Sequence, residues 1–143
     1  MGMSKQELKA RALAAIDENR DNIIELGDSV YAEPELGYKE FKTAEKVKKA
    51  FAVLEIPYRD EVGITGVIGT VQGKSNKLKV AVMGELDAIT APSHPDADVR
   101  TGAAHACGHN CQLASMLGAA YGLMASGVMS ELAGEVAFMA VPA

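Results

Sequence analysis

The chain opens with segments whose apolar residues recur at helical spacing. Residues 4–19 and residues 21–31 both follow this pattern, and the second helix is predicted to stop before Pro34 because proline restricts the residue ahead of it. A third helix is predicted over residues 40–54, with lysines opposite its apolar face. The apolar side of the first helix is predicted to hold Leu8, Ala12, Leu13 and Ile16. The third helix is predicted to turn inward Phe41, Ala44, Val47, Phe51 and Leu54.

After residue 60 the pattern changes to that of strands. Residues 62–71 and 78–86 are rich in β-branched and apolar side chains, and residues 72–76 join them, which predicts a hairpin or a pair of neighbouring strands. Residues 78–86 are apolar almost throughout after Lys79, as is typical of a strand covered on both faces. Residues 135–141 predict a third strand, and residues 90–104 an irregular loop.

A stretch from Leu113 to Ser130 carries no charged residue and approaches the length of a membrane span. Its glycines and its polar flanks favour instead a buried helix, with small residues where it meets a sheet. This helix is predicted to begin near Asn110, a good N-cap residue. The order of helices, strands, helix and strand predicts an α/β layered domain.

Composition narrows the class of protein. A length of 143 residues suits a single domain, and the formal net charge of −5 argues against nucleic acid or an anionic membrane as a partner. Residues 4–21 alternate charged and apolar positions, so they hold no signal peptide core. Two cysteines make no disulfide framework, and we expect a cytoplasmic protein.

The chain stops at Ala143, directly after the third predicted strand. We therefore expect it to be the front part of a longer protein. We also expect the third strand to be exposed, and an exposed strand edge favours self-association.

The stretch HACGHNCQ, residues 105–112, holds two of the three histidines and both cysteines. Cys107 and His109 form a Cys-x-His pair that suits zinc, and Asp87 could orient a ligating imidazole. Ligands gather at the carboxyl ends of strands in open α/β sheets. Glu85 and Asp87, the Cys107–His109 pair and Pro142–Ala143 are therefore expected to converge on one cleft.

Other interpretations of these residues stay open. Either cysteine can be a small buried hydrophobe, and His105 a hydrogen-bonded core or loop histidine. Cys107 and Cys111 could form a redox pair, although their spacing is not Cys-x-x-Cys. Glu85 and Asp87 could be a solvated strand end. His94, in a proline-flanked loop, is expected at the surface or in a pocket lining rather than on a metal.

Three motifs together resemble the M20 metallopeptidases, in particular their amidohydrolase branch, which includes hippurate, indole-acetyl amino acid and aminobenzoyl-glutamate hydrolases. They are PELGYKEFKTAEKV (34–47), GELDAI (84–89) and HACGHNCQLASMLGAA (105–120). The resemblance covers nearly the whole chain. It implies the N-terminal portion of an α/β/α zinc-peptidase-like catalytic domain.

The resemblance also implies roles for individual residues. Cys107 and His109 would be ligands of a centre with two divalent metals, zinc or manganese, and Asp87 the acidic residue that supports it. Glu85 and Asn110 stand where Asp is commoner in the family, and Gln112 where many members carry His. The family's next motif, a glutamate base followed by a glutamate ligand, would begin after Ala143.

The implied activity of the full-length protein is hydrolysis of an amide bond in N-acyl amino acids or small peptides. The resemblance implies a homodimer that binds a small-molecule substrate, with no nucleic acid or membrane partner. Residues 1–143 alone would be inactive, because the base and later ligands would be missing. The alternative from another class is a metal-free binding module that keeps the fold.

Overall fold

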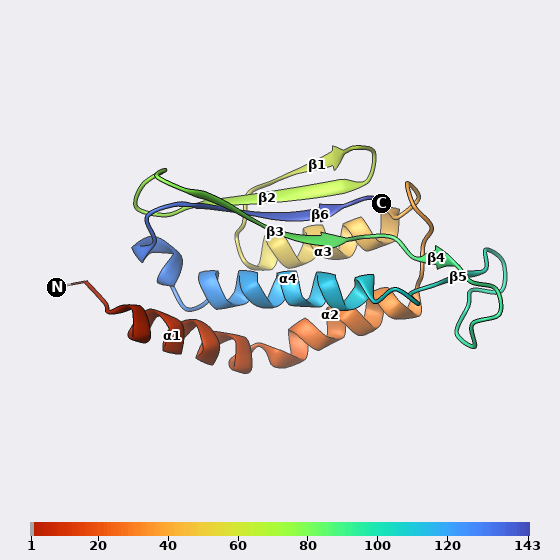
Figure 1. Cartoon of the computed structure of the whole chain (residues 1–143), viewed down its shortest axis with the longest axis horizontal. Coiled ribbons are helices and arrows are strands. Elements are labelled where there is room, and N and C mark those ends of the chain that lie inside the picture. The colour runs from red at the N-terminus through yellow and green to blue at the C-terminus, as the bar shows by residue number, and fades with distance from the viewer. Residues whose placement is uncertain (1) are drawn as a thin grey trace.

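The computed structural model describes residues 2–143, which form a mixed sheet with helices on one side of it (Figure 1). The helices are α1 (Lys5–Glu18), α2 (Arg20–Ala32), α3 (Phe41–Val53), α4 (His109–Met124) and the short 3₁₀ helix η1 (Val128–Glu131). The strands are β1 (Tyr58–Val62), β2 (Gly66–Gln72), β3 (Lys79–Glu85), β4 (Ile89–Thr90), β5 (Ala103–Ala104) and β6 (Glu135–Val141). The α/β class predicted from the sequence is confirmed.

The main sheet has the order β1-β2-β6-β3. Strand β6 pairs antiparallel with β2 and parallel with β3, so the last strand of the chain lies between two earlier ones. The prediction that residues 62–71 and 78–86 pair with each other is therefore wrong. Residues 62–71 also divide, because β1 ends at Val62 and a turn leads into β2.

Two expectations about strand exposure are wrong for the same reason. Strand β6, expected at an exposed edge, is hydrogen-bonded on both sides. Strand β3, expected to be covered on both faces, forms the edge of the sheet and leaves Met83 57% exposed. An apolar run is typical of a buried strand, but strand order is set by pairing between distant segments, which the run does not encode.

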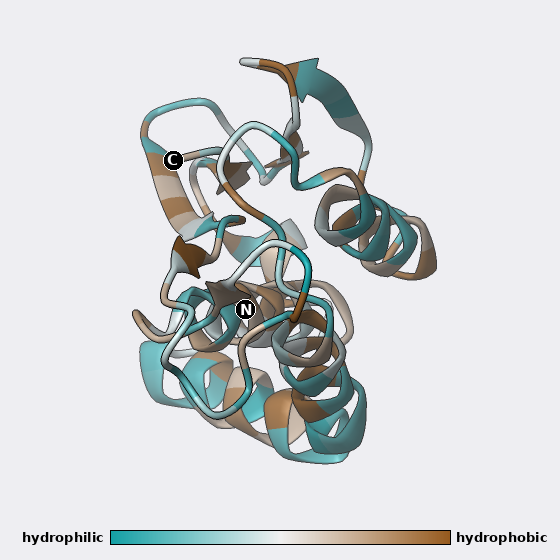
Figure 2. Cartoon of the chain, turned by 90° about the vertical axis from the view of Figure 1, so that its right-hand side faces the viewer, coloured by the Kyte–Doolittle hydropathy of each residue, from teal (hydrophilic) through white to brown (hydrophobic). Residues whose placement is uncertain are grey.

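One hydrophobic core joins the sheet to the helices. Phe51 of α3 and Phe138 of β6 are fully buried, with ring centroids 6.3 Å apart. Leu113 of α4 and Val30 of α2 belong to the same buried cluster. The helical turns carry both hydrophobic and hydrophilic residues (Figure 2), as expected for amphipathic helices.

The helices agree with their predicted ranges, although two side chains differ. Leu13 of α1 is 62% exposed, because the buried stripe runs through Ala15 instead. Phe41 is 60% exposed because it is the first residue of α3, whereas Val47 and Phe51 face the core as predicted.

Helix α4 is buried along most of its length, but its start and its neighbours differ from expectation. Its N-cap is Gly108, in the left-handed region at φ 87°, and Asn110 lies inside the helix. Asn110 is buried and its Nδ2 donates to the Gly27 carbonyl, so the N-cap prediction is wrong. Its two glycines face helices rather than the sheet: Gly118 faces Ile23 of α2 and Gly122 faces Ile16 of α1. No helix within residues 2–143 combines the length and apolar character needed to cross a membrane.

Candidate metal centre

The carboxyl end of β3 meets the first residue of α4. Strands β3 and β6 are parallel, so both end at the same edge of the sheet, and the Leu86 N–H donates to the Val141 carbonyl over 2.9 Å. Asp87 follows directly. The left-handed conformation of Gly108, which glycine adopts without steric cost, turns the chain into α4 with His109 at its start. The end of β3 and His109 of the Cys-x-His pair are thus brought together.

The imidazole of His109 lies between two carboxylates. Its Nδ1 is 2.7 Å from Oδ1 of Asp87 and 2.9 Å from the Asp87 carbonyl oxygen, while its Nε2 is 2.9 Å from Oε2 of Glu85. Asp87 and His109 are largely buried, and Glu85 is more exposed. Carboxylates only accept hydrogen bonds, so both contacts are satisfied together when both ring nitrogens carry a proton. Asp87 thus contacts Nδ1 of the ring through its carboxylate and its carbonyl oxygen.

Gln112 completes this cluster from the next turn of α4. Its Nε2 donates to Oε2 of Glu85 over 3.3 Å, and its Oε1 accepts from the Glu85 N–H over 3.2 Å. Gln112 thus holds Glu85 at its side chain and at its backbone. Sequence reasoning did not assign it this role, although its position three residues after His109 places both on one helix face.

His105 is buried beside this cluster, and neither ring nitrogen has a hydrogen-bond partner within residues 2–143. Burial lowers the pKa of His105 below its usual value of 6.5, and the charge of His109 lowers it further. His105 is therefore a buried histidine held in its neutral form, although the hydrogen bonds expected for a core or loop histidine are absent within residues 2–143.

Both cysteines are free and exposed, so their interpretation as small buried hydrophobes is wrong. Cys107 lies two residues before α4 begins and Cys111 in its first turn. Within residues 2–143 there is no group of three or more His, Cys, Asp or Glu side chains arranged to hold a metal ion. The chemistry of a thiolate, an imidazole and carboxylates fits a divalent metal such as zinc, but these residues supply only part of a coordination shell.

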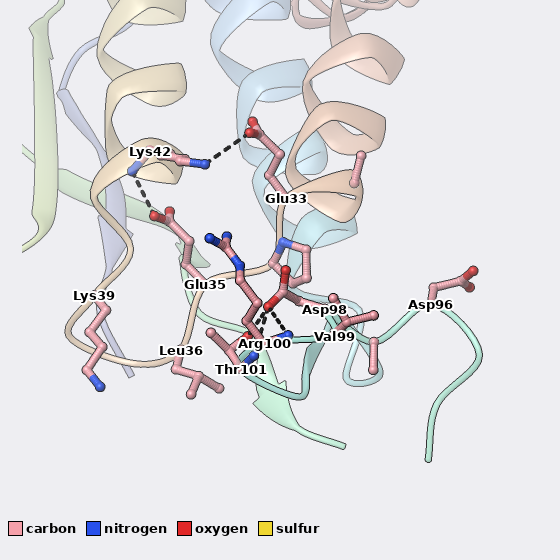
Figure 3. A pocket seen from close by; sticks show the side chains of 13 residues that line it. Glu33, Glu35, Leu36, Lys39, Lys42, Asp96, Asp98, Val99, Arg100 and Thr101 are labelled. Atoms are coloured by element: carbon pink, nitrogen blue, oxygen red, sulfur yellow. Dashed lines mark hydrogen bonds and ion pairs between the residues drawn. The ribbon is translucent and has the colours of Figure 1, made fainter. Parts of the chain in front are cut away.

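A separate cavity of about 620 Å³ lies between residues 32–42 and the loop at residues 96–101 (Figure 3). The carboxylates that line this cavity form ion pairs and hydrogen bonds with neighbouring residues. Glu33 pairs with Lys42, Glu35 accepts from the Lys42 backbone N–H, and Asp98 accepts from the Thr101 N–H over 2.8 Å. None of the four residues Glu85, Asp87, Cys107 and His109 lines this cavity. His94 is half-buried outside both places, and its Nδ1 accepts from the Asp96 N–H.

Known proteins resemble this chain over most of its length. Thermostable carboxypeptidase 2 of Saccharolobus solfataricus is 31% identical over 132 residues, which cover 90% of this chain and 33% of the relative. IAA-amino acid hydrolase ILR1-like 2 of Arabidopsis thaliana is 31% identical over 120 residues, covering 82% of this chain and 27% of the relative. No protein-family model matches the chain.

A solved structure is similar to most of this chain. The crystal structure of a Bacillus subtilis protein described as a dinuclear metal binding peptidase from the M20 family superposes with a TM-score of 0.76 at 28% identity. The match covers 89% of this chain and 36% of that protein. The chain is related to the M20 peptidases and amidohydrolases. The resemblance carried by the three sequence motifs is thereby confirmed. The chain spans about a third of the length of its M20 relatives.

Proposed function

We propose that residues 1–143 are the N-terminal portion of the catalytic domain of a metal-dependent amidohydrolase. The observation that carries this proposal is the cluster of Glu85, Asp87 and His109, where the end of β3 meets the start of α4. Amide hydrolysis is supported by the relatives, which are named as a carboxypeptidase, an IAA-amino acid hydrolase and an N-acetylcysteine deacetylase. The substrate of the full-length protein is proposed to be an N-acyl amino acid or a small peptide.

Cys107 and His109 are proposed as metal ligands and Asp87 as the residue that positions His109. With Asp87 accepting from Nδ1, the other ring nitrogen is left for a metal, and Glu85 already lies beside it. Two divalent ions, zinc or manganese, are proposed for the full-length protein. A divalent metal in such a site polarises a carbonyl and lowers the pKa of bound water.

The remaining ligands and the general base are proposed to come from polypeptide that the M20 relatives have and this chain does not match. The described residues offer too few donors for a closed site, and the chain spans a third of its relatives. Residues 1–143 alone are therefore expected to hydrolyse N-acyl amino acids at a negligible rate. The full-length protein is proposed to act as a cytoplasmic homodimer; the two free cysteines fit a reducing compartment.

Titration with Co²⁺ tests the metal ligands, because a thiolate bound to Co²⁺ gives a charge-transfer absorption band. We expect a band in the wild-type chain that disappears in Cys107→Ser and persists in Cys111→Ser, the matched control. Loss of the band in Cys111→Ser with retention in Cys107→Ser would contradict the assignment. A chain without any band, even when extended to the full length of its relatives, would exclude Cys107 as a ligand and favour the metal-free binding module.

Release of free amino acid from N-acyl substrates, with Zn²⁺ or Mn²⁺ added, tests the proposed division of the site. Loss of a proton shuttle costs ~10²–10⁴-fold in rate, and loss of metal ligands adds to that. We therefore expect residues 1–143 to show no turnover above that of the Cys107→Ser and His109→Ala double variant. Turnover by the wild-type chain at an ordinary enzyme rate would show that these residues already contain a complete site.

A further inference from the structure

Glu85, the last residue of β3, is held in place from α4 at both its side chain and its backbone. Its Oε2 lies 2.9 Å from Nε2 of His109 and accepts from Nε2 of Gln112 over 3.3 Å. Its backbone N–H donates to Oε1 of Gln112 over 3.2 Å. The side chain is 40% exposed, yet these contacts distinguish it from a freely solvated carboxylate at the end of a strand.

Gly84 allows α4 to come close enough to β3 for these contacts. A Cβ atom at position 84 would lie 3.0 Å from Cδ2 of Leu113 and 3.2 Å from the carbonyl oxygen of Gln112. Such distances are too short for ordinary packing, so any other residue there would push strand and helix apart. Glycine is the residue that permits this kind of close backbone approach. The packing of the backbone therefore sets Gln112 beside Glu85.

Glu85 lies on the side of the His109 ring that is left for a metal. Asp87 contacts Nδ1, and Glu85 contacts Nε2. Zinc binds nitrogen and carboxylate oxygen at about 2.0–2.2 Å, so two such donors on one ion lie ~2.9–3.4 Å apart. The 2.9 Å between Oε2 of Glu85 and Nε2 of His109 falls in this range. We propose that Glu85 is itself a ligand of the metal that His109 binds, and that Gln112 is its positioning residue.

This assignment adds an oxygen donor to the thiolate of Cys107 and the imidazole of His109. Zinc accepts all three donor types, and a carboxylate also neutralises part of the charge of the ion. The ion takes the place of the proton between Nε2 of His109 and Oε2 of Glu85, and that proton passes to solvent. Asp87 stays on the opposite nitrogen and supports the ring from behind.

Titration with Co²⁺ tests Glu85 with two substitutions that separate ligation from charge. Glu85→Gln keeps the length of the side chain and removes its charge, whereas Glu85→Asp keeps the charge and shortens the reach. We expect both to raise the Co²⁺ concentration at half-saturation at least about tenfold, since even a residue behind a ligand contributes ~10–100-fold. The control is Glu25→Gln, which removes one charge from the exposed side of α2 and should leave this concentration unchanged.

Gln112→Ala tests the positioning role, because it removes both hydrogen bonds to Glu85 and leaves the carboxylate in place. We expect it to weaken Co²⁺ binding about tenfold, as is typical of a residue that supports a ligand. In a chain that already carries Glu85→Gln, we expect no further loss, because a positioning residue acts only through the group that it holds. An equal loss in both backgrounds would overturn the positioning role.

The inference rests on the proposed metal centre, but the two can fail separately. A thiolate band with unchanged half-saturation in both Glu85 variants would overturn the inference and keep Cys107 as a ligand. A loss in Glu85→Gln alone would make Glu85 only a nearby charge, and tighter binding in either variant would make it a competitor of the metal; both results overturn the inference.

Calorimetric titration with Zn²⁺ decides the case of a wild-type chain without a thiolate band. Weaker Zn²⁺ binding in both Glu85 variants would then support Glu85 as a ligand and remove Cys107 from the site. A wild-type chain that binds no Zn²⁺ would overturn both the inference and the proposed metal ligands.

Discussion

Asp87 and His109, which are 22 residues apart in the chain, are joined by a 2.7 Å contact between a carboxylate oxygen and Nδ1. The same nitrogen lies 2.9 Å from the Asp87 carbonyl oxygen, so one residue holds the ring from two directions. Because Asp87 holds Nδ1, the ring is oriented with Nε2 toward Glu85. It gives the proposed metal centre its most specific geometric feature.

Replacement of Asp87 by Asn is therefore expected to weaken metal binding. Loss of a carboxylate behind a ligating histidine typically costs about 10–100-fold in metal affinity, because ring orientation and ligand basicity both suffer. Calorimetric titration with Zn²⁺ measures the change. Asp96→Asn is the control, because Asp96 accepts from the Tyr31 hydroxyl away from the cluster. Equal affinities for wild type and Asp87→Asn would show that His109 does not depend on this contact.

Glu35→Ala is expected to destabilise the fold by about 1–2 kcal/mol. The Glu35 carboxylate accepts from the backbone N–H of Lys42 over 3.2 Å and from that of Thr43 over 2.8 Å, and so caps the start of α3. Removing a side chain that caps a helix typically costs about 0.5–2 kcal/mol. Urea unfolding followed by circular dichroism gives the difference. Glu25→Ala, on the exposed side of α2, is the control and should change stability by less than ~0.5 kcal/mol.

Gly118→Ala and Gly122→Ala, one helical turn apart on α4, are expected to act in opposite directions. A methyl group at Gly118 would lie 3.7 Å from Ile23, an ordinary contact. Alanine is favoured over glycine inside a helix by about 1 kcal/mol, so Gly118→Ala should raise the free energy of unfolding. A methyl group at Gly122 would lie 3.0 Å from Ile16 and 3.3 Å from the Ala12 carbonyl oxygen.

Thermal unfolding of the two variants measures this difference directly. We expect a higher Tm than wild type for Gly118→Ala and a lower one for Gly122→Ala, because the Ile16 side chain and the Ala12 carbonyl of α1 must shift to admit the second methyl group. Since both substitutions give the same gain in helix propensity, a similar Tm change in both would mean that α1 does not pack closely on α4.

The ion pairs of Glu33 predict a small dependence of stability on pH. Lys46, and then Lys42, lower the pKa of Glu33 below its usual 4.5. Because the folded pKa is the lower one, this stabilisation is present above pH 4.5 and is lost as pH falls through the folded pKa. Glu33 is about half exposed, so the gain is a few tenths of a kcal/mol. Glu33→Gln should lower the Tm slightly at pH 7 and not at pH 3.

Helix bounds depend mainly on residues that are close together in the sequence. Helices α1 to α3 begin and end within a few residues of their predicted bounds, since spacing and the proline at position 34 act within one or two turns. The start of α4 was misplaced because Asn110 has the side chain of an N-cap, whereas the chain turns at Gly108. The helix therefore starts after the turn at Gly108 and not at Asn110, although Asn110 has a side chain suited to an N-cap.

The candidate site shows the same division. The Cys-x-His spacing and the acidic residues Glu85 and Asp87 at the end of β3 predict metal chemistry from the sequence alone. Contacts from Asp87 and Glu85 to the two nitrogens of His109 follow from the packing of α4 against β3, as does the support from Gln112. No local pattern could assign these, because they join residues on separate elements.

Residue spacing and side-chain chemistry predicted the helices, the α/β class and the candidate metal ligands, and three sequence motifs carried the resemblance to M20 enzymes. The order β1-β2-β6-β3 of the described residues was decided only by the tertiary structure. The physical reason is that helix formation and turns depend on neighbours along the chain, whereas strand order depends on which distant segments bury their surfaces together. Strand β6 closes the core through Phe138, and β3 is thereby left at the edge.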